Sequence, residues 1–229
     1  PAPAAQGAVI QPAPAAPRKL PPRRPPLPQD RALAPSPADA PSQTDLGNRQ
    51  LSAGDCLGAA ETFRQSLQRA PDPAAFAGMV RALRAAGTPE LARQYLKDGL
   101  SAFPTAPVLL RQGVALALDS DDEIPLADLA GRLVALAPHD PWTLTALGIG
   151  RLRQNRPTEA LSSFAESLEL APTAVENLYY QGLCHDRLGD YNRALACYRR
   201  FLAEAGDRHP THRRWLQGRI ALLERADRH

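Results

Sequence analysis

Four prolines recur along the chain at steps of 33 or 34 residues: Pro71, Pro104, Pro138 and Pro172. Three further series keep the same step, and their members are Gly54, Gly87, Asp121, Asn155 and Gly189; Gly47, Val80, Val114, Gly148 and Gly182; and Phe63, Leu96, Ala130, Phe164 and Tyr198. A period of roughly 20 to 50 residues is typical of a solenoid, and about 34 residues suit one helix–turn–helix unit. The chain is therefore predicted to be an all-α stack of repeats.

The segment 176–207 indicates what one unit contains. Apolar residues recur every three to four positions on both sides of Gly189, which predicts two amphipathic helices. Glycine, asparagine or aspartate at this position suits the positive φ that the chain reversal needs. A small residue in the first helix lets the second helix pack closely, the aromatic residue fills the space between units, and the proline ends the second helix.

These features resemble the tetratricopeptide repeat. A small residue follows leucine, as in Leu147-Gly148, and an alanine stands four residues before an aromatic residue or leucine. The alanine pairs are Ala59–Phe63, Ala92–Leu96, Ala160–Phe164 and Ala194–Tyr198. The resemblance covers residues 42–208 and implies a right-handed superhelical solenoid of about five helix pairs. The third unit is degenerate, because Ala130 takes the aromatic position and Pro125 lies near the start of its second helix.

The two ends differ from the repeats. Residues 209–229 predict a capping helix and tail, because Trp215, Leu216, Ile220 and Leu223 share one helical face that can cover the last unit. Residues 1–41 hold 13 of the 24 prolines and hardly any bulky apolar residues. Such a segment buries too little surface to offset its ordering entropy, so we expect an extended or disordered arm.

The formal net charge of +3 resides entirely in this arm, since the remainder carries 22 basic and 22 acidic residues. A neutral repeat region argues against a nucleic-acid surface. Within the arm, Arg18, Lys19, Arg23 and Arg24 are the residues expected to contact another subunit or an anionic surface. The arm also contains PxxP spacings of the kind that aromatic grooves bind, and a simple spacer is the alternative.

The sequence contains no phosphate-binding glycine loop, no CxxC and no nucleophile–base spacing. Cys184 and Cys197 suit packed thiols, with a disulfide as the alternative in an oxidising compartment. His209 and His212 have only Asp207 as an acidic neighbour, and the acidic stretch 119–123 lacks the glycine and closing glutamate of a calcium loop. We therefore expect no enzyme activity, no metal and no cofactor.

Function is expected on the concave face, which the first helices of stacked pairs line. By the family register, the resemblance implies that the inward-facing residues are Arg81, Arg84, Val108, Arg111, Leu118, Trp142, Thr145, Ile149, Leu152, Arg153, Tyr179, Leu183 and Arg187. Aromatic residues beside arginines are typical of interface cores. The alternative is that Trp142 packs between units and the arginines form a solvated face. Thr44 and Asn48 are followed by no matching lysine, so the carboxylate-binding chaperone mode of the family is not predicted.

The chain is accordingly predicted to be a scaffold or adaptor that binds a protein or peptide segment in its groove. Because the sequence begins at Pro1 without methionine, we expect a processed or truncated product that an envelope anchor or signal peptide preceded. This favours an accessory subunit of a bacterial secretion, pilus or polysaccharide-export assembly, periplasmic or membrane-anchored. No run of 18 apolar residues is present, so membrane contact would come through the anchor or a partner. The alternatives are an accessory region of a larger enzyme such as a glycosyltransferase, and a cytosolic chaperone.

Overall fold

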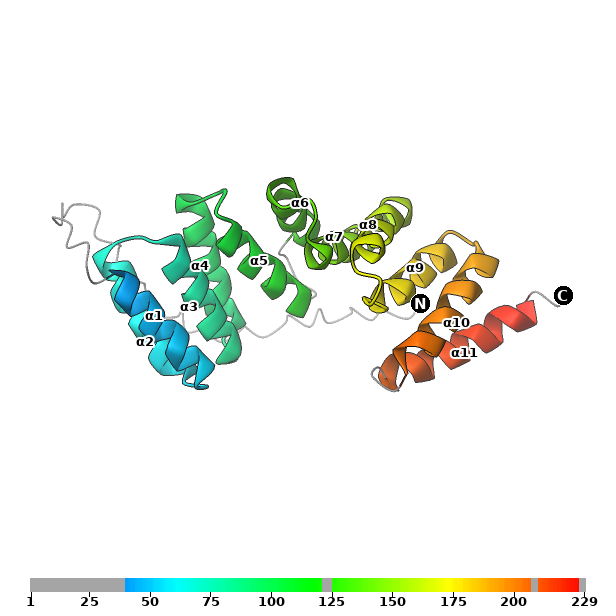
Figure 1. Cartoon of the computed structure of the whole chain (residues 1–229), viewed down its shortest axis with the longest axis horizontal. Coiled ribbons are helices and arrows are strands. Elements are labelled where there is room, and N and C mark those ends of the chain that lie inside the picture. The colour runs from blue at the N-terminus through cyan, green and yellow to red at the C-terminus, as the bar shows by residue number, and fades with distance from the viewer. Residues whose placement is uncertain (1–39, 121–124, 207–209, 227–229) are drawn as a thin grey trace, which may run out of the picture. The chain divides into compact units, whose positions relative to one another are not determined.

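The computed structural model describes residues 40–120, 125–206 and 210–226, which all belong to one compact unit, Ser36–His229. The arm residues Arg18, Lys19, Arg23 and Arg24 lie outside the described residues. The described part is all-α and contains eleven helices and no strand (Figure 1). In chain order they are α1 (Ala40–Ser52), α2 (Cys56–Arg69), α3 (Pro73–Ala85), α4 (Pro89–Ala102), α5 (Pro107–Asp119), α6 (Leu126–Leu136), α7 (Pro141–Arg153), α8 (Pro157–Leu170), α9 (Glu176–Arg187), α10 (Tyr191–Ala205) and α11 (Pro210–Ala226).

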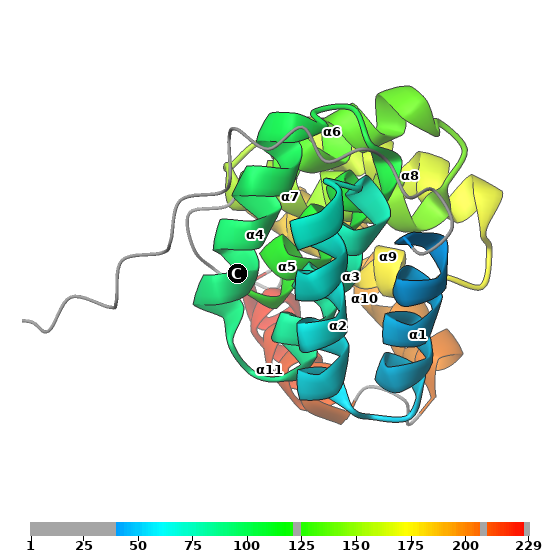
Figure 2. The ribbon, with the colours of Figure 1, turned by 90° about the vertical axis from the view of Figure 1, so that its left-hand side faces the viewer.

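The helices form five pairs, α1/α2 to α9/α10, followed by the single helix α11, which confirms the predicted repeat fold. Helices α2, α4, α6 and α8 each end two residues before one of the recurring prolines. Within the pairs, Gly54, Gly87, Asn155 and Gly189 take positive φ at the chain reversal, between 57° and 82°. The position of Asp121 in this series lies outside the described residues. Figure 2 shows α1 and α2 side by side, joined at one end by their short turn.

A glycine facing an aromatic ring holds three of the pairs together. Phe164 and Tyr198 are completely buried, and a Cβ atom added to Gly148 would lie 2.5 Å from the ring of Phe164. One added to Gly182 would lie 2.3 Å from the ring of Tyr198. The first unit has the same arrangement at Gly47 and its phenylalanine. Helix and ring therefore touch with no room for a side chain between them.

The second and third units fill the space between their two helices with a different pair of side chains. Val80 and Leu96 belong to one apolar cluster, and Val114 and Ala130 belong to another. All four side chains are buried. In these two units valine replaces the glycine of the first helix, and leucine or alanine replaces the aromatic residue of the second helix. The degenerate third unit therefore still packs as a helix pair.

The first helices of the pairs also touch one another. Contacts join α1 to α3, α3 to α5, α5 to α7 and α7 to α9, whereas no two second helices are in contact within the described ranges. A stack whose elements approach on one side and separate on the other is curved. The first helices therefore line its concave side, as the sequence predicted. None of the described helices is both long and apolar enough to cross a membrane.

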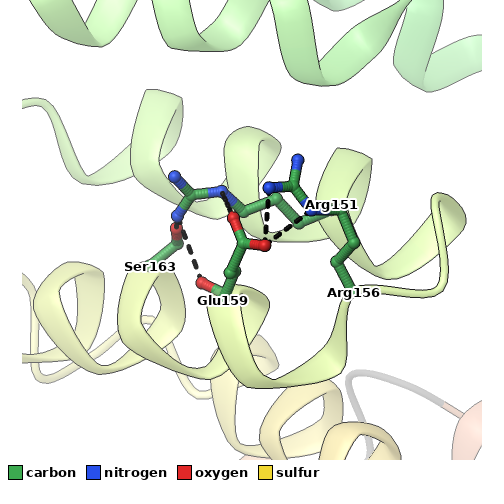
Figure 3. A network of polar contacts seen from close by, with 4 residues as sticks. All are labelled: Arg151, Arg156, Glu159 and Ser163. Carbon is green, nitrogen blue, oxygen red and sulfur yellow. Dashed lines mark hydrogen bonds and ion pairs between the residues drawn. The ribbon is translucent and has the colours of Figure 1, made fainter.

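Polar bonds fix the fourth pair on the side of α8 (Figure 3). Arg151 of α7 donates to Ser163 Oγ at 2.6 Å and to the backbone oxygen of Glu159 at 3.1 Å. Arg156, at the start of α8, binds the Glu159 carboxylate at 2.6 Å. This network lies within one pair, so we assign it to the joining of α7 and α8 and not to the groove.

Replacing glycine by alanine should have opposite effects on stability at a position that faces a ring and at a position that faces open space. Gly148→Ala should lower the free energy of unfolding by about 1–3 kcal/mol, because the added methyl group overlaps the buried Phe164 ring. Gly131→Ala in α6 should raise it by about 0.5–1 kcal/mol, because nothing lies within 4 Å of an added Cβ there and alanine favours the helix. Urea unfolding followed by circular dichroism measures both. Equal effects of the two substitutions would contradict the assigned contact.

Candidate functional site

Two arginines of the concave face bind the ends of preceding helices. Arg153 of α7 donates to the backbone oxygens of Ala117 at 2.8 Å and Ser120 at 3.0 Å, at the end of α5. Arg187 of α9 donates to the backbone oxygen of Leu152 at 2.5 Å, at the end of α7. The last carbonyls of a helix lack partners within it and carry its negative partial charge. The two arginines, one repeat apart, therefore join successive units.

The two arginines of α3, in the second unit, make similar links. Arg81 of α3 donates to the side-chain oxygen of Asn48 on α1. Arg84 of α3 forms an ion pair of 3.4 Å with Asp119 of α5. Both arginines, which were predicted to line the groove, are thus bonded between first helices.

Trp142 lies at the junction of α5 and α7. The Arg111 guanidinium carbon stands 4.4 Å from the centroid of its ring, a cation–π contact, and Arg111 also donates to Asp140 at 2.8 Å. Burial opposes ionisation of Asp140, but hydrogen bonds from Thr143 and Arg111 hold its pKa below the ordinary value. Trp142 is half-buried and packs against a core cluster. It therefore belongs both to the contact between units and to the surface of the groove.

The apolar residues predicted for the groove differ in exposure. Leu118, Ile149 and Leu183 are half-buried at the edges of core clusters. Leu152 is only 5% exposed and lies in the core, so it offers a partner almost no surface. Val108, which is 47% exposed on α5, offers more surface than the others in this set.

Thr145 is held in a polar network below the surface. Its hydroxyl donates to Asn177 Oδ1 at 2.9 Å and lies 2.9 Å from Ser167 Oγ. The amide of Asn177, which is fully buried, donates to the same serine at 3.0 Å. Each of these groups has a partner within the protein, so the network joins α7, α8 and α9 and is satisfied without a ligand.

Tyr179 lies in a cluster of rings that attaches α11 to the last pair. Its ring centroid is 4.6 Å from that of His212 and 6.1 Å from that of Trp215, both edge-on, and 5.8 Å from that of Phe201. Tyr198 contacts Trp215 in the same edge-on way at 6.1 Å. Tyr179 therefore supports the cap as well as the groove.

An ion pair completes this attachment. Arg219 of α11 holds both carboxylate oxygens of Asp186 on α9, at 2.6 and 2.7 Å, and the Tyr198 hydroxyl donates to the same group at 3.1 Å. These bonds, above all that from Arg219, keep the pKa of Asp186 below its ordinary value although burial acts against them. The carboxylate is charged and fully occupied by its neighbours.

A hollow of about 850 Å³ lies between α9 and α11 at the C-terminal end of the concave side. We call it the cap groove; the pair Asp186–Arg219 lies along it, and its other lining residues are Leu183, Arg187, Arg214, Trp215, Gly218 and Leu222. Sequence reasoning assigned Leu183 and Arg187 to the concave face but missed Asp186 and the five lining residues from α11. The sequence signal for these residues was a second apolar face on α11, formed by Trp215 and Leu222. In the structure these two side chains remain 46% and 57% exposed.

Chemistry-bearing side chains elsewhere are few. Burial raises the pKa of the Cys184 thiol to about 12, so this thiol is protonated and packs as an apolar group. Cys56, Cys184 and Cys197 are free cysteines. In the described ranges, no three histidine, cysteine or acidic side chains gather in a way that could hold a metal ion.

Comparison with protein families agrees with the helix pairs. The family model described as Tetratricopeptide repeat matches residues 44–107 and 145–210, which is more than half of the chain. The chain belongs to the tetratricopeptide repeat family. The unmatched stretch between the two regions contains α5 and α6, the pair with alanine at the aromatic position. No curated protein matches the chain.

Solved structures of tetratricopeptide repeat proteins share the fold. MamA from Desulfovibrio magneticus RS-1, from residue 41 to its end, superposes with a TM-score of 0.64 at 17% identity, over 73% of this chain and 96% of MamA. YrrB, described as a TPR protein with an unusual peptide-binding site, superposes with a TM-score of 0.65 at 17% identity, over 83% of this chain and 93% of YrrB. At this identity the likeness concerns the fold alone.

The ion pair between α9 and α11 predicts acid sensitivity of the cap of this tetratricopeptide repeat. Because the pKa of Asp186 is lower in the folded than in the unfolded chain, its stabilisation is present above the unfolded value of about 3.9 and is lost as pH falls through the folded value. Asp186→Asn should lower the free energy of unfolding by about 1–3 kcal/mol at pH 7.

Urea unfolding curves between pH 7 and pH 2.5 measure the difference in free energy of unfolding between wild type and Asp186→Asn. This difference should become smaller as the pH falls. Glu90→Gln serves as the control, since Glu90 is paired with Arg93 on the surface and is 82% exposed at its side chain. A difference between wild type and Asp186→Asn that stays constant with pH would contradict the assignment.

Proposed function

We propose that this tetratricopeptide repeat protein is a non-enzymatic scaffold that binds a protein or peptide segment in its concave groove. The observation on which the proposal rests is the arrangement of the first helices, which touch one another and line a continuous concave side that ends in the cap groove. Half-buried apolar side chains and arginines lie along this side, a composition that interface cores favour. The peptide-binding site in the description of YrrB supports the same use of the fold.

Within the groove, the proposed contact residues are Arg81, Arg84, Arg111, Leu118, Trp142, Ile149, Arg153, Tyr179, Leu183 and Arg187. Their arginines are bonded between units, so a partner would meet a preformed surface and would order few side chains on binding. Preorganisation of this kind lowers the entropic cost of association.

Selection of random 12-residue peptides on the immobilised full chain tests the proposal. We expect sequences to be enriched that bind in solution with a measurable Kd and compete with one another. No enrichment over the bare support, or selected peptides that fail to bind in solution, would contradict a peptide-binding groove.

Trp142→Ala should weaken binding of a selected peptide by about 2 kcal/mol, roughly 30-fold in Kd, if Trp142 is an anchor. Isothermal titration measures the affinity, and a thermal melt of the variant reports the loss of the Arg111 contact separately. The same two measurements on Tyr179→Ala distinguish an anchor from a residue that only holds the cap. If both variants keep their helicity and bind the peptide with unchanged affinity, Trp142 and Tyr179 contribute to packing and not to peptide binding.

We extend the proposal to an accessory subunit of a bacterial envelope assembly, supported by the proline-rich arm that the sequence places before the repeats. Arg18, Lys19, Arg23 and Arg24 would then contact another subunit. Deleting residues 1–41 should leave the melting temperature of the repeats nearly unchanged, because the segment has little apolar surface to bury, but reduce recruitment to the assembly. A large fall in melting temperature would mean that the arm packs on its own repeats.

A further inference from the structure

The cap groove differs from the rest of the concave side in its backbone spacing. Every earlier pair of successive first helices is in contact, but no Cα atom of α9 lies within 8 Å of one of α11 among the described residues. The two helices are joined across the gap by the side chains of Arg219 and Asp186. The stack therefore opens at its last step, and the opening is the cap groove.

The walls of this opening are apolar and accessible. Trp215, Gly218 and Leu222 lie three and four residues apart along one face of α11, and Leu183 faces them from α9. Trp215 and Leu222 are 46% and 57% exposed, which is unusual for such side chains next to one another. Nothing lies within 4 Å of a Cβ atom added to Gly218, so the middle of the stripe is open.

The charges of the cap groove are unbalanced. Its only carboxylate, Asp186, is held on both oxygens by Arg219. Arg187 donates to a neutral backbone oxygen, and the exposed Arg214 has neither an ion pair nor a hydrogen bond to a described residue. Among the described residues, these two guanidinium groups beside the apolar stripe therefore have no carboxylate partner.

Charge is also distributed unevenly between the helices, although the repeat region is neutral as a whole. The first helices and α11 carry eleven arginines, namely Arg49, Arg81, Arg84, Arg111, Arg151, Arg153, Arg187, Arg213, Arg214, Arg219 and Arg225. They carry five acidic residues, namely Asp45, Asp119, Glu176, Asp186 and Glu224. The second helices, α2 to α10, carry eight of each sign. Among the described helices, the excess of positive charge therefore lies in the first helices and α11.

We infer that the cap groove binds an acidic peptide segment, with one bulky apolar side chain over Gly218 between Trp215 and Leu222 and carboxylates paired with Arg187 and Arg214. This inference rests on the proposed function and specifies the chemistry of the partner. The charge of the groove complements acidic residues and disfavours the chain's own arm, whose net charge is +3. A peptide also suits the stripe better than nucleic acid does, because Leu183 and Leu222 offer no stacking surface for bases.

Gly218→Glu is the discriminating variant. The new side chain enters the open part of the stripe, and its carboxylate stands one helical turn from Arg214, where it competes with a carboxylate of the partner. Glutamate favours a helix over glycine, so α11 should remain folded. Gly131→Glu in α6 is the matched control, because that glycine also has nothing within 4 Å of an added Cβ. Gly218→Ala separates the effect of charge and bulk from that of helix propensity.

The experiment uses the 12-residue peptides selected on the full chain. We expect them to be rich in aspartate and glutamate around one leucine, phenylalanine or tryptophan, and to bind more weakly as salt is raised from 50 to 300 mM. Gly218→Glu should weaken their binding tenfold or more, while Gly131→Glu and Gly218→Ala change it less than threefold. Circular dichroism should show a helical fold in all variants, and none should melt below the wild-type temperature, because each replaces a glycine inside a helix.

Four results would overturn the inference. Selected peptides that are neutral or basic would leave the proposed function standing and refute the acidic partner. Acidic peptides that bind Gly218→Glu as tightly as wild type would place the site elsewhere in the groove. A 20-nucleotide single strand that binds more tightly than the selected peptides, and that Gly218→Glu weakens equally, would identify a nucleic-acid surface instead. A selection that enriches no peptide refutes the proposed function and the inference together.

Discussion

The buried ring of Phe164 rests against the backbone of Gly148, and the ring of Tyr198 rests in the same way against Gly182. This close approach fixes the distance between the two helices of a pair, and every further contact in the stack depends on that distance. Successive first helices also contact one another, including α3 and α5, which have valine in place of the glycine. The concave side exists because these approaches repeat on one side only.

Arginine acts on this surface in two capacities. Arg153 and Arg187 bind the carbonyl ends of the preceding first helices, and in doing so they fix one unit relative to the next. The guanidinium group of Arg187 also brings positive charge to the cap groove. A carbonyl carries only part of a unit charge, so a hydrogen bond to it leaves most of the positive charge of the guanidinium uncompensated. Stability between units and affinity for an anionic partner can therefore come from one set of side chains.

The cap replaces a sixth pair with a single helix. Rings of Tyr179, His212 and Trp215 and the pair Asp186–Arg219 attach α11 to α9 and α10. Because no Cα atom of α11 lies within 8 Å of one of α9, the exposed stripe of α11 lines the cap groove.

The sequence by itself determined the repeat, because its determinants are local: proline ends a helix, glycine or asparagine reverses the chain, and the small and aromatic positions recur in register with them. It predicted five pairs and a cap, the positive φ of Asn155 and Gly189, and the burial of the aromatic series. Only the tertiary structure decided which of the predicted groove residues are buried and which are bonded to other parts of the protein. Three features depend on the angle and spacing between units: Leu152 lies in the core, Arg187 binds a carbonyl 35 residues earlier, and Leu222 lines an opening. Those quantities arise from packing between residues far apart in the chain, which a periodic pattern leaves undetermined.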